Sequence, residues 1–248
     1  MANEITMPTS RASLCALGEY LKRHCCCAPL REQVRIPQKM VRYRPIDTVL
    51  DGVLGILCGA KTLAQSKSTI RVDPAVQRAC GRTGCAEQST IARTLQASTA
   101  ETVDHLNRVS WYYVKRSGQT PHHRFAARLL WVDVDITPLP IGAQAEGSAR
   151  TGMGRHRSKT GRTVVRWTAR AYRAILHETW LRGQASAVPA LKTALGELET
   201  RLGWTRERRQ RIVLRFDGGC GTTESLNGLL SRGYQVVATI SHSGRVRK

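Results

Sequence analysis

The sequence predicts a mixed α/β domain preceded by a small all-helical domain. Between residues 45 and 120, apolar side chains recur at spacings of three and four, which is typical of helices. After residue 128, β-branched and apolar residues alternate in short segments. Two helical segments interrupt these strands, which gives the order β-β-β-α-β-α-β. A chain of 248 residues is long enough for both parts.

The charge of the chain indicates a polyanionic partner. There are 39 Lys and Arg residues against 18 Asp and Glu residues, a net charge of +21. Nucleic acid is the simplest such partner, because each neutralised phosphate releases counterions; a membrane surface is the weaker alternative. Aromatic residues make up only 5% of the chain, which argues against single-strand binding by base stacking.

The chain opens with no signal-peptide pattern, and its longest stretch without Asp, Glu, Lys or Arg runs only from Gly233 to Gly244. This stretch is shorter than the roughly 20 apolar residues that a membrane-spanning helix needs. We therefore expect a soluble, cytoplasmic protein.

The eight cysteines favour a reduced setting over a disulfide framework. Three of them are consecutive in the cluster His24–Cys27, and the others show no small-domain spacing. Both this cluster and the pair Cys80 and Cys85 admit a metal-binding interpretation. Neither has the two Cys-x-x-Cys pairs of a typical zinc site, so packed thiols are the favoured interpretation.

Residues 1–44 predict a basic arm with one short helix from Leu14 to Leu21. Outside that helix the segment shows little apolar periodicity. Its three Glu residues stand against eight basic residues, namely Arg11, Lys22, Arg23, Arg31, Arg35, Lys39, Arg42 and Arg44.

Residues 45–120 predict a helical DNA-binding domain. Ile46 to Leu57 has the period of a buried helix, with Pro45 near its start. Further on, Ser98 and Glu101 form a capping-box pattern that predicts a helix through Val109 toward Lys115. The breaker-rich stretch Ser117–His123 predicts a linker to the second domain.

A helix-turn-helix is one interpretation of the middle of this domain. The helical segment Pro74–Cys80 is followed by the turn Gly81–Gly84 and by the short amphipathic segment Glu87–Leu95. The second helix would present Gln88, Ser89 and Arg93 to a DNA groove. An ordinary helical bundle explains the pattern equally well.

The strands of the second domain follow from alternation and from their flanking breakers. Leu129–Thr137 is expected to end at Pro138, and Gly203 is expected to end a helix that runs through four regularly spaced leucines from Leu191 to Leu202. The other expected elements are the strands Thr163–Ala169, Ala171–Trp180, Arg211–Asp217 and Gln235–Ile240, and a helix from Thr222 to Leu230.

Basic residues cluster before two of these strands. The loop from Arg155 to Arg162 is expected to contact DNA, although a solvated surface is the usual role of such a charge run. The cluster Arg206 to Arg211 either contacts DNA or solvates a turn. The residues assigned to DNA in the second domain are Arg155, Arg157, Lys159, Arg162 and Arg215.

Two carboxylates are the candidates for chemistry. Asp135 and Asp217 are each expected at the carboxyl end of a strand, where α/β sheets place their ligands if the strands are parallel neighbours. Such a pair can share Mg²⁺, which prefers oxygen ligands and substrate phosphate. Asp133 lies on the same strand face as Asp135 and is a candidate for supporting the site. A turn cap or an ion pair with Arg is the alternative role for each.

These residues resemble the DDE-type transposases of bacterial insertion sequences, enzymes with a ribonuclease H-like catalytic domain. The resemblance covers about residues 45–248 and is carried by Trp131–Thr137, Ala145–Gly147, Leu214–Thr222, Leu229–Tyr234 and Cys85–Ile91. It implies a catalytic domain over residues 128–248, with Asp135 and Asp217 as the first two acids of a triad that binds Mg²⁺ or Mn²⁺. It also implies metal-dependent cleavage and transfer of transposon-end DNA by a homodimer.

The resemblance departs from the family at the third acid. In the family this residue is a Glu on a helix well downstream of the strand that here ends near Ile240, and residues 1–248 contain no matching position. The catalytic domain is therefore expected to be incomplete, and residues 1–248 alone are expected to show little or no strand transfer.

Two other functions fit parts of the pattern. A non-catalytic DNA-binding regulator or remnant would need only the basic segments and the helix-turn-helix. A metal-dependent nuclease on the same fold would need the carboxylates without recognition of transposon ends.

Overall fold

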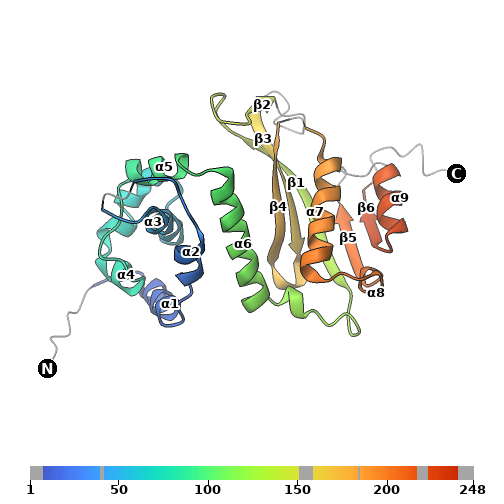
Figure 1. Ribbon diagram of the computed structural model, residues 1–248, viewed down its shortest axis with the longest axis horizontal. Coiled ribbons are helices and arrows are strands. Elements are labelled where there is room, and N and C mark those ends of the chain that lie inside the picture. Colours follow the sequence, from blue (N-terminus) through green and yellow to red (C-terminus); the bar gives the residue numbers. More distant parts are fainter. Residues whose placement is uncertain (1–7, 40–41, 151–158, 184, 217–222, 240–248) are drawn as a thin grey trace. The chain divides into compact units, whose positions relative to one another are not determined.

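The computed structural model describes residues 8–39, 42–150, 159–183, 185–216 and 223–239 (Figure 1). The chain divides into two compact units between Tyr113 and Val114. Within the described ranges, none of the helices has the length and apolar character that crossing a membrane requires.

The first unit is helical. Its elements are α1 (Ala12–Arg23), α2 (Ala28–Gln33), α3 (Pro45–Leu57), two 3₁₀ turns (Leu63–Lys67 and Ile70–Val72), α4 (Pro74–Ala79), α5 (Gln88–Gln96) and most of α6 (Ala100–Ser117). α4 packs chiefly against α1, and α5 packs chiefly against α3. The predicted helices of this unit are therefore present, and the two helices of the helix-turn-helix interpretation have different main partners.

The predicted basic arm is not seen in the described part of residues 1–44. Gly18 of α1 lies so close to α4 that a Cβ there would stand 2.7 Å from the Cys80 sulfur. Val34 is buried together with Ile46 and Val109. Contacts distant in sequence therefore anchor this segment to the helical unit at Gly18 and Val34, although most of its residues are exposed or partly exposed. The high charge of the segment gave no sign of these contacts.

The buried side of α3 also differs from the prediction. Asp51 is fully buried, whereas Val53 and Leu57, which belong to the predicted apolar period, are 46% and 47% exposed. Arg82 accounts for the difference because its Nε and Nη2 donate to the two Asp51 carboxylate oxygens at 2.8 and 3.0 Å. The backbone N–H of Ala86 donates to the same carboxylate at 2.8 Å. A paired buried charge thus replaces the expected apolar contact and ties the segment before α5 to α3.

α6 begins one residue later than its capping-box pattern predicts. The backbone N–H of Thr102 donates to the Thr99 hydroxyl at 3.3 Å, and the backbone N–H of Thr99 donates to the Thr102 hydroxyl at 3.2 Å. This reciprocal pair satisfies two amide groups at the helix start, the role predicted for Ser98 and Glu101.

The second unit is built on one mixed sheet. Its strands are β1 (Leu130–Pro140), β2 (Ala149–Arg150), β3 (Thr160–Ala169), β4 (Ala174–Arg182), β5 (Ile212–Phe216) and β6 (Gln235–Ala238). Its helical elements are α7 (Ala187–Leu202), α8 (Arg206–Arg209), α9 (Thr223–Ser231) and the 3₁₀ turns Thr120–His122 and Arg170–Tyr172. β2 and α8 were not predicted.

The strand order is β4-β3-β1-β5-β6, with the short β2 also paired to β3. β3 is antiparallel to β1 and β4, whereas β1, β5 and β6 are parallel. Three antiparallel strands followed by two helix-connected parallel strands form a ribonuclease H-like sheet. The predicted fold class, a mixed α/β sheet preceded by a helical region, is confirmed.

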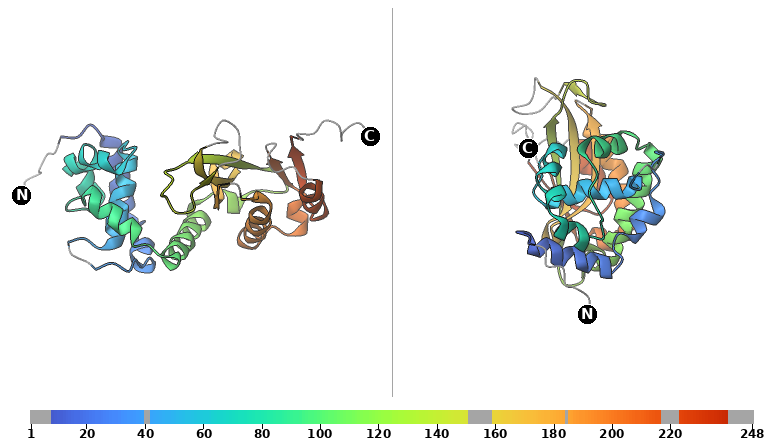
Figure 2. Two further views of the ribbon diagram at one scale, coloured as in Figure 1. Left: turned by 90° about the horizontal axis from the view of Figure 1, so that it is seen from above. Right: turned by 90° about the vertical axis from the view of Figure 1, so that its left-hand side faces the viewer.

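One face of the sheet packs against α7 and α9 (Figure 2, left). Val134 is 2% exposed on this face, and its strand neighbours Trp167 and Phe216 are 0% and 4% exposed. Leu198 of α7 is also fully buried. At the end of α7 the chain turns at Gly203, whose φ of 62° favours glycine, as predicted.

β1 does not end at Pro138 but continues to Pro140, and it pairs with β3 from Val132 to Pro140. The backbone N–H of Ile141 donates to Thr160, so residues of even number in this stretch turn their nitrogen away from β3. Described pairing with β5 ends at Val134. Pro138 and Pro140 therefore remove no ladder hydrogen bond of the described sheet. This is why β1 tolerates both prolines.

Candidate active site and DNA-contact surfaces

Asp133 and Asp135 lie on the sheet face opposite to α7. Alternation along β1 buries Val132 and Val134 and turns the two carboxylates to the other face, as the period of two predicts. Asp135 is exposed, and the Asp133 side chain is 27% exposed. Asp135 lies in the middle of β1, but just beyond the last described residue that pairs with β5.

Asp133 is held by an ion pair across the β1–β5 ladder. Arg215 faces it in the parallel register and donates from Nη2 to Asp133 Oδ2 at 2.7 Å. The other carboxylate oxygen, Oδ1, is buried and has no hydrogen-bond partner among the described residues. Arg215, predicted as a DNA contact, is therefore also the partner of Asp133, and its charge is partly neutralised in the protein.

Asp135 has a different environment. The Thr137 hydroxyl donates to Asp135 Oδ2 at 2.5 Å. Across the ladder Asp135 faces Arg166, whose Nε donates to Glu178 Oε2 at 2.7 Å. Arg166 was missed at the sequence level because only the antiparallel register places it beside Asp135. Glu178 also accepts a hydrogen bond from the Trp180 ring nitrogen at 3.0 Å.

Asp217 lies outside the described residues. The described pairing of β1 and β5 ends at Val134 and Phe216. In the sequence these are the residues directly before Asp135 and Asp217.

The donor chemistry of this region fits a hard divalent cation. Asp135 offers exposed carboxylate oxygens, and Asp133 has a buried carboxylate oxygen without a described partner. Mg²⁺ and Mn²⁺ prefer such oxygen donors. Within the described ranges there is no cluster of three or more His, Cys, Asp or Glu residues arranged to hold a metal. The described part thus offers two candidate ligands, of which Asp133 is already paired with Arg215.

The three α5 residues predicted to contact DNA are all exposed. Gln88, Ser89 and Arg93 lie on the side of α5 that turns away from the buried Ile91 and Thr94. Ser89 and Arg93 are four residues apart and share one stripe of the helix, and Gln88 is the first residue of the helix beside that stripe. α5 can therefore present them to a DNA groove, in a segment anchored by the Arg82–Asp51 ion pair.

The predicted basic loop is described only in part, because Arg155 and Arg157 lie outside the described residues. Lys159 is exposed beside the start of β3. Arg162 lies within β3 rather than in a loop, and its guanidinium carbon is 5.5 Å from the centre of the Trp180 ring. The longer strand changes the role of Arg162 from a loop contact to a half-buried side chain stacked on an edge strand.

The cysteine positions support the packed-thiol interpretation. Cys80 and Cys85 pack against the buried cluster of Cys58, Ile70 and Val76. Burial raises the pKa of Cys80 to about 11 and that of Cys85 to about 12. Both thiols therefore stay protonated near neutral pH, which disfavours metal ligation and nucleophilic chemistry.

No protein-family model and no curated protein matches the chain. Among solved structures it is similar to piggyBac transposase in a synaptic complex with hairpin DNA, with 12% identity and a TM-score of 0.46 over 89% of this chain and 48% of that one. It is also similar to a pre-cleavage Mos1 transpososome, with 12% identity and a TM-score of 0.30 over 99% of this chain and 72% of that one.

A third similar structure is the Mos1 mariner paired-end complex with Mn, with 11% identity and a TM-score of 0.32 over 97% of this chain and 81% of that one. The chain spans about half the length of the piggyBac transposase.

Proposed function

We propose that the chain is a transposase of the DDE type, from a bacterial insertion sequence, that binds transposon-end DNA and supplies two acids of a site for metal-dependent strand cleavage and transfer. Asp135 and Asp217 are the proposed ligands of Mg²⁺ or Mn²⁺. Asp133 positions the site through its ion pair with Arg215. The working form is proposed to be a homodimer on two DNA ends.

The parallel pairing of β1 with β5 is the observation that carries this proposal. It brings Val134 beside Phe216, and a candidate acid follows each of them in the chain. Ligands of α/β sheets bind at the carboxyl ends of parallel strands, so the two acids are proposed to meet there. A divalent ion bound by both would supply the Lewis acid that activates water or a 3′-hydroxyl for attack on a phosphodiester.

Metal binding gives the direct test. Mn²⁺ is titrated into the whole chain, and the free ion is measured by electron paramagnetic resonance. Asp135→Asn and Asp217→Asn are each expected to weaken the tightest Mn²⁺ site by roughly tenfold or more, because each removes a charged ligand. The exposed Asp104 of α6 provides the matched control, and Asp104→Asn is expected to bind Mn²⁺ like the wild type. Unchanged binding by both ligand variants would contradict the proposal.

Two assays separate this function from its alternatives. Plasmid nicking in Mn²⁺ that disappears in Asp135→Asn indicates catalysis, whereas DNA binding without any Mn²⁺ site at these residues indicates a non-catalytic regulator. Duplexes selected by the chain from a random pool then test end recognition. Nicking without preference for the selected duplexes indicates a nuclease.

The α5 surface has its own expected result. Arg93→Ala is expected to weaken binding to the selected duplexes by roughly tenfold, and binding to random duplex by much less, because a groove contact reads sequence. Arg78 of α4 is equally exposed and supplies a control with the same loss of charge. Fluorescence anisotropy measures both affinities. Equal losses of affinity for the selected duplexes in Arg93→Ala and Arg78→Ala would show that α5 is not the helix that recognises the DNA sequence.

A further inference from the structure

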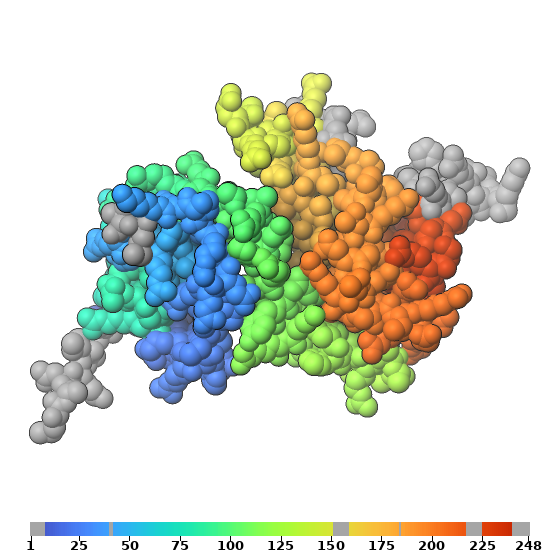
Figure 3. Space-filling model, viewed as in Figure 1, coloured from blue at the N-terminus to red at the C-terminus, as the bar shows by residue number. Residues whose placement is uncertain are grey.

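A basic pocket lies at the amino end of β1, and the geometry points to a site there for a phosphate of the DNA backbone. The pocket has a volume of about 380 Å³, and its walls come from the end of α6, the segment before β1 and the turn between β3 and β4. Figure 3 shows the chain from Arg116 to Arg128 (green) at the molecular surface. That the phosphate belongs to DNA rests on the proposed function.

The chemistry of the walls suits a phosphodiester. Arg116, Arg124 and Arg128 line the pocket together with His122. The lining lies entirely within the described part of the second unit and contains no carboxylate. Guanidinium groups bind phosphate oxygens through paired N–H donors and keep their charge at every physiological pH. Three of them around one concave surface favour a dianionic or monoanionic oxygen group over any neutral ligand.

A buried histidine fixes two walls of this pocket. His123 is 6% exposed, and its Nε2 lies 3.2 Å from the carbonyl oxygen of Arg128. A carbonyl can only accept, so Nε2 carries the proton, and Nδ1 accepts from the Tyr172 hydroxyl at 2.7 Å. Burial lowers the pKa of His123, so the ring is neutral near pH 7. It adds no charge, but it holds the backbone of Arg128 and the ring of Tyr172 in place.

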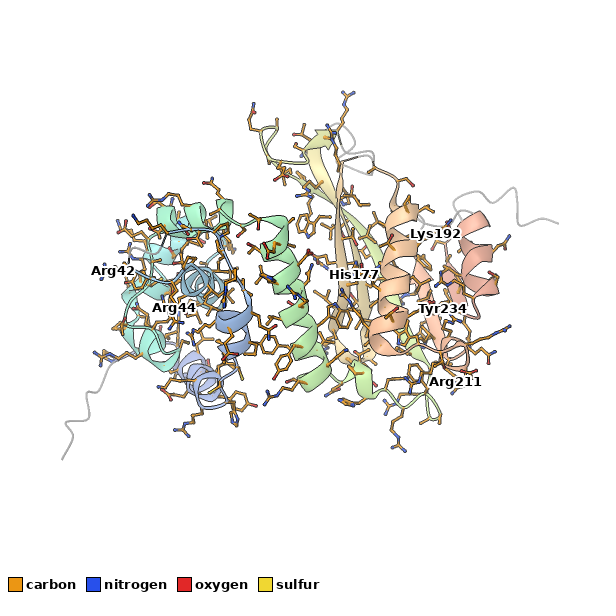
Figure 4. The ribbon with its side chains drawn as sticks, viewed as in Figure 1. Arg42, Arg44, His177, Lys192, Arg211 and Tyr234 are labelled. Atoms are coloured by element: carbon orange, nitrogen blue, oxygen red, sulfur yellow. The ribbon has the colours of Figure 1, made fainter. Side chains whose placement is uncertain are left out.

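The segment is also tied to β5. The Nε of Arg211, labelled in Figure 4 beside the amino end of β5, donates to the carbonyl oxygen of Phe125 at 3.1 Å. The guanidinium carbon of Arg208 lies 5.6 Å from the centre of the Phe125 ring. These contacts place two more arginines beside the pocket segment.

The pocket segment leads directly into the strand of the candidate acids. Leu130 begins β1 two residues after Arg128, and Asp135 lies five residues further on, which corresponds to about 17 Å along β1 at 3.3 Å per residue. This length is shorter than one turn of duplex DNA, roughly 34 Å, so one duplex is long enough to reach both the pocket segment and Asp135.

The salt dependence of DNA binding tests this site. Affinity of the whole chain for a labelled random duplex is measured by anisotropy between 50 and 200 mM KCl. In Arg124→Gln/Arg128→Gln, the slope of log affinity against log salt is expected to fall in magnitude by about one, since one lost phosphate contact removes about 0.9. Arg124→Lys/Arg128→Lys keeps the charges, and its slope is expected to match the wild type.

Two controls decide the outcome. Arg23→Gln/Arg78→Gln removes two exposed charges from α1 and α4 and is expected to leave the slope unchanged. A slope in Arg124→Gln/Arg128→Gln equal to that of this control overturns the inference. Inorganic phosphate that binds the pocket as tightly as the duplex, at equal ionic strength, also overturns it and assigns the pocket to a free anion.

The same measurements keep this inference distinct from the proposed function. If Asp135→Asn and Asp217→Asn leave Mn²⁺ binding unchanged while the arginine variant lowers the slope, the catalytic proposal fails and the phosphate site stands. If the slope is unchanged while Mn²⁺ binding is lost, the phosphate site fails and the catalytic proposal stands.

Discussion

Asp51→Ala is expected to lower the free energy of unfolding of the helical unit by about 3–5 kcal/mol, because it removes both hydrogen-bond acceptors of a buried guanidinium and leaves it only the Asp47 carboxylate at 3.6 Å. Asp51 is fully buried, and the Arg82 side chain is only 8% exposed. The Ala86 N–H also loses its acceptor. Urea denaturation followed through Trp111, which lies in the first unit, reports on this unit, after the other four tryptophans are replaced by Phe.

The exposed Asp104 again supplies the control, and Asp104→Ala is expected to change stability by less than about 0.5 kcal/mol. In Asp51→Leu/Arg82→Met both charges are gone, so the double variant is expected to be more stable than Asp51→Ala. A loss below about 1 kcal/mol in Asp51→Ala would show that the pair does not hold the unit together.

Glu199→Gln is expected to destabilise the second unit by about 2–3 kcal/mol. Glu199 of α7 accepts from the Tyr234 hydroxyl at 2.7 Å, pairs with Arg209 at 3.1 Å, and pairs with Arg232. Tyr234, labelled in Figure 4, lies directly before β6 and is 3% exposed. The Glu199 carboxylate therefore holds the start of β6 against α7 and α8. Charge-assisted hydrogen bonds contribute about 1.5–3 kcal/mol each, reduced here because both arginines are partly exposed.

Two variants calibrate that loss. Tyr234→Phe removes one of the hydrogen bonds and is expected to cost about 1 kcal/mol. Glu197→Gln, on the same helix, removes a partly exposed pair with Arg201 and a longer contact of 3.9 Å with His177, and it is expected to cost less than about 1 kcal/mol. Thermal or urea unfolding monitored through Trp204, which packs edge-on to Tyr234, measures all three variants. Equal losses in Glu199→Gln and Glu197→Gln would contradict the central role of Glu199.

The same carboxylate sets a pH dependence. Burial alone would raise the pKa of Glu199, but hydrogen bonds from Arg232, Tyr234 and Arg209 hold it below its ordinary value of 4.5. A lowered folded-state pKa stabilises the protein at pH values above the unfolded-state pKa. The free energy of unfolding of the wild type is therefore expected to decrease as the pH falls below about 4.5, because Glu199 becomes protonated. In Glu199→Gln this part of the decrease is expected to be absent.

Elements governed by local rules were predictable from the sequence. Leucine spacing and Gly203 located α7, and alternation located β1 and its two faces. The buried side of α3 was not predictable, because the partner of Asp51 is Arg82, 31 residues away. Residues 1–44 carry many charges and little apolar periodicity, which suggested a basic arm. Their contacts with distant residues, which bury Val34 beside Ile46 and Val109, could not be predicted from that pattern.

The candidate site was predictable to the same degree. The period of two correctly placed Asp133 and Asp135 together on one face of the sheet. The partners Arg215 and Arg166 depend on strand order and register, which no single segment encodes. The pocket arginines were overlooked because breakers before β1 suggested a linker, whereas the fold anchors that segment through His123 and Arg211.

The two prolines of β1 have a consequence for self-association. Pro138 and Pro140 lie beyond Val134, where the described pairing of β1 with β5 has ended. Their nitrogens point away from β3, to the side where the described part of the sheet has no neighbouring strand. An added strand from another molecule would find no N–H donor at Pro138 or Pro140. This stretch of backbone is therefore a poor template for edge-to-edge aggregation, even in a sheet that exposes it.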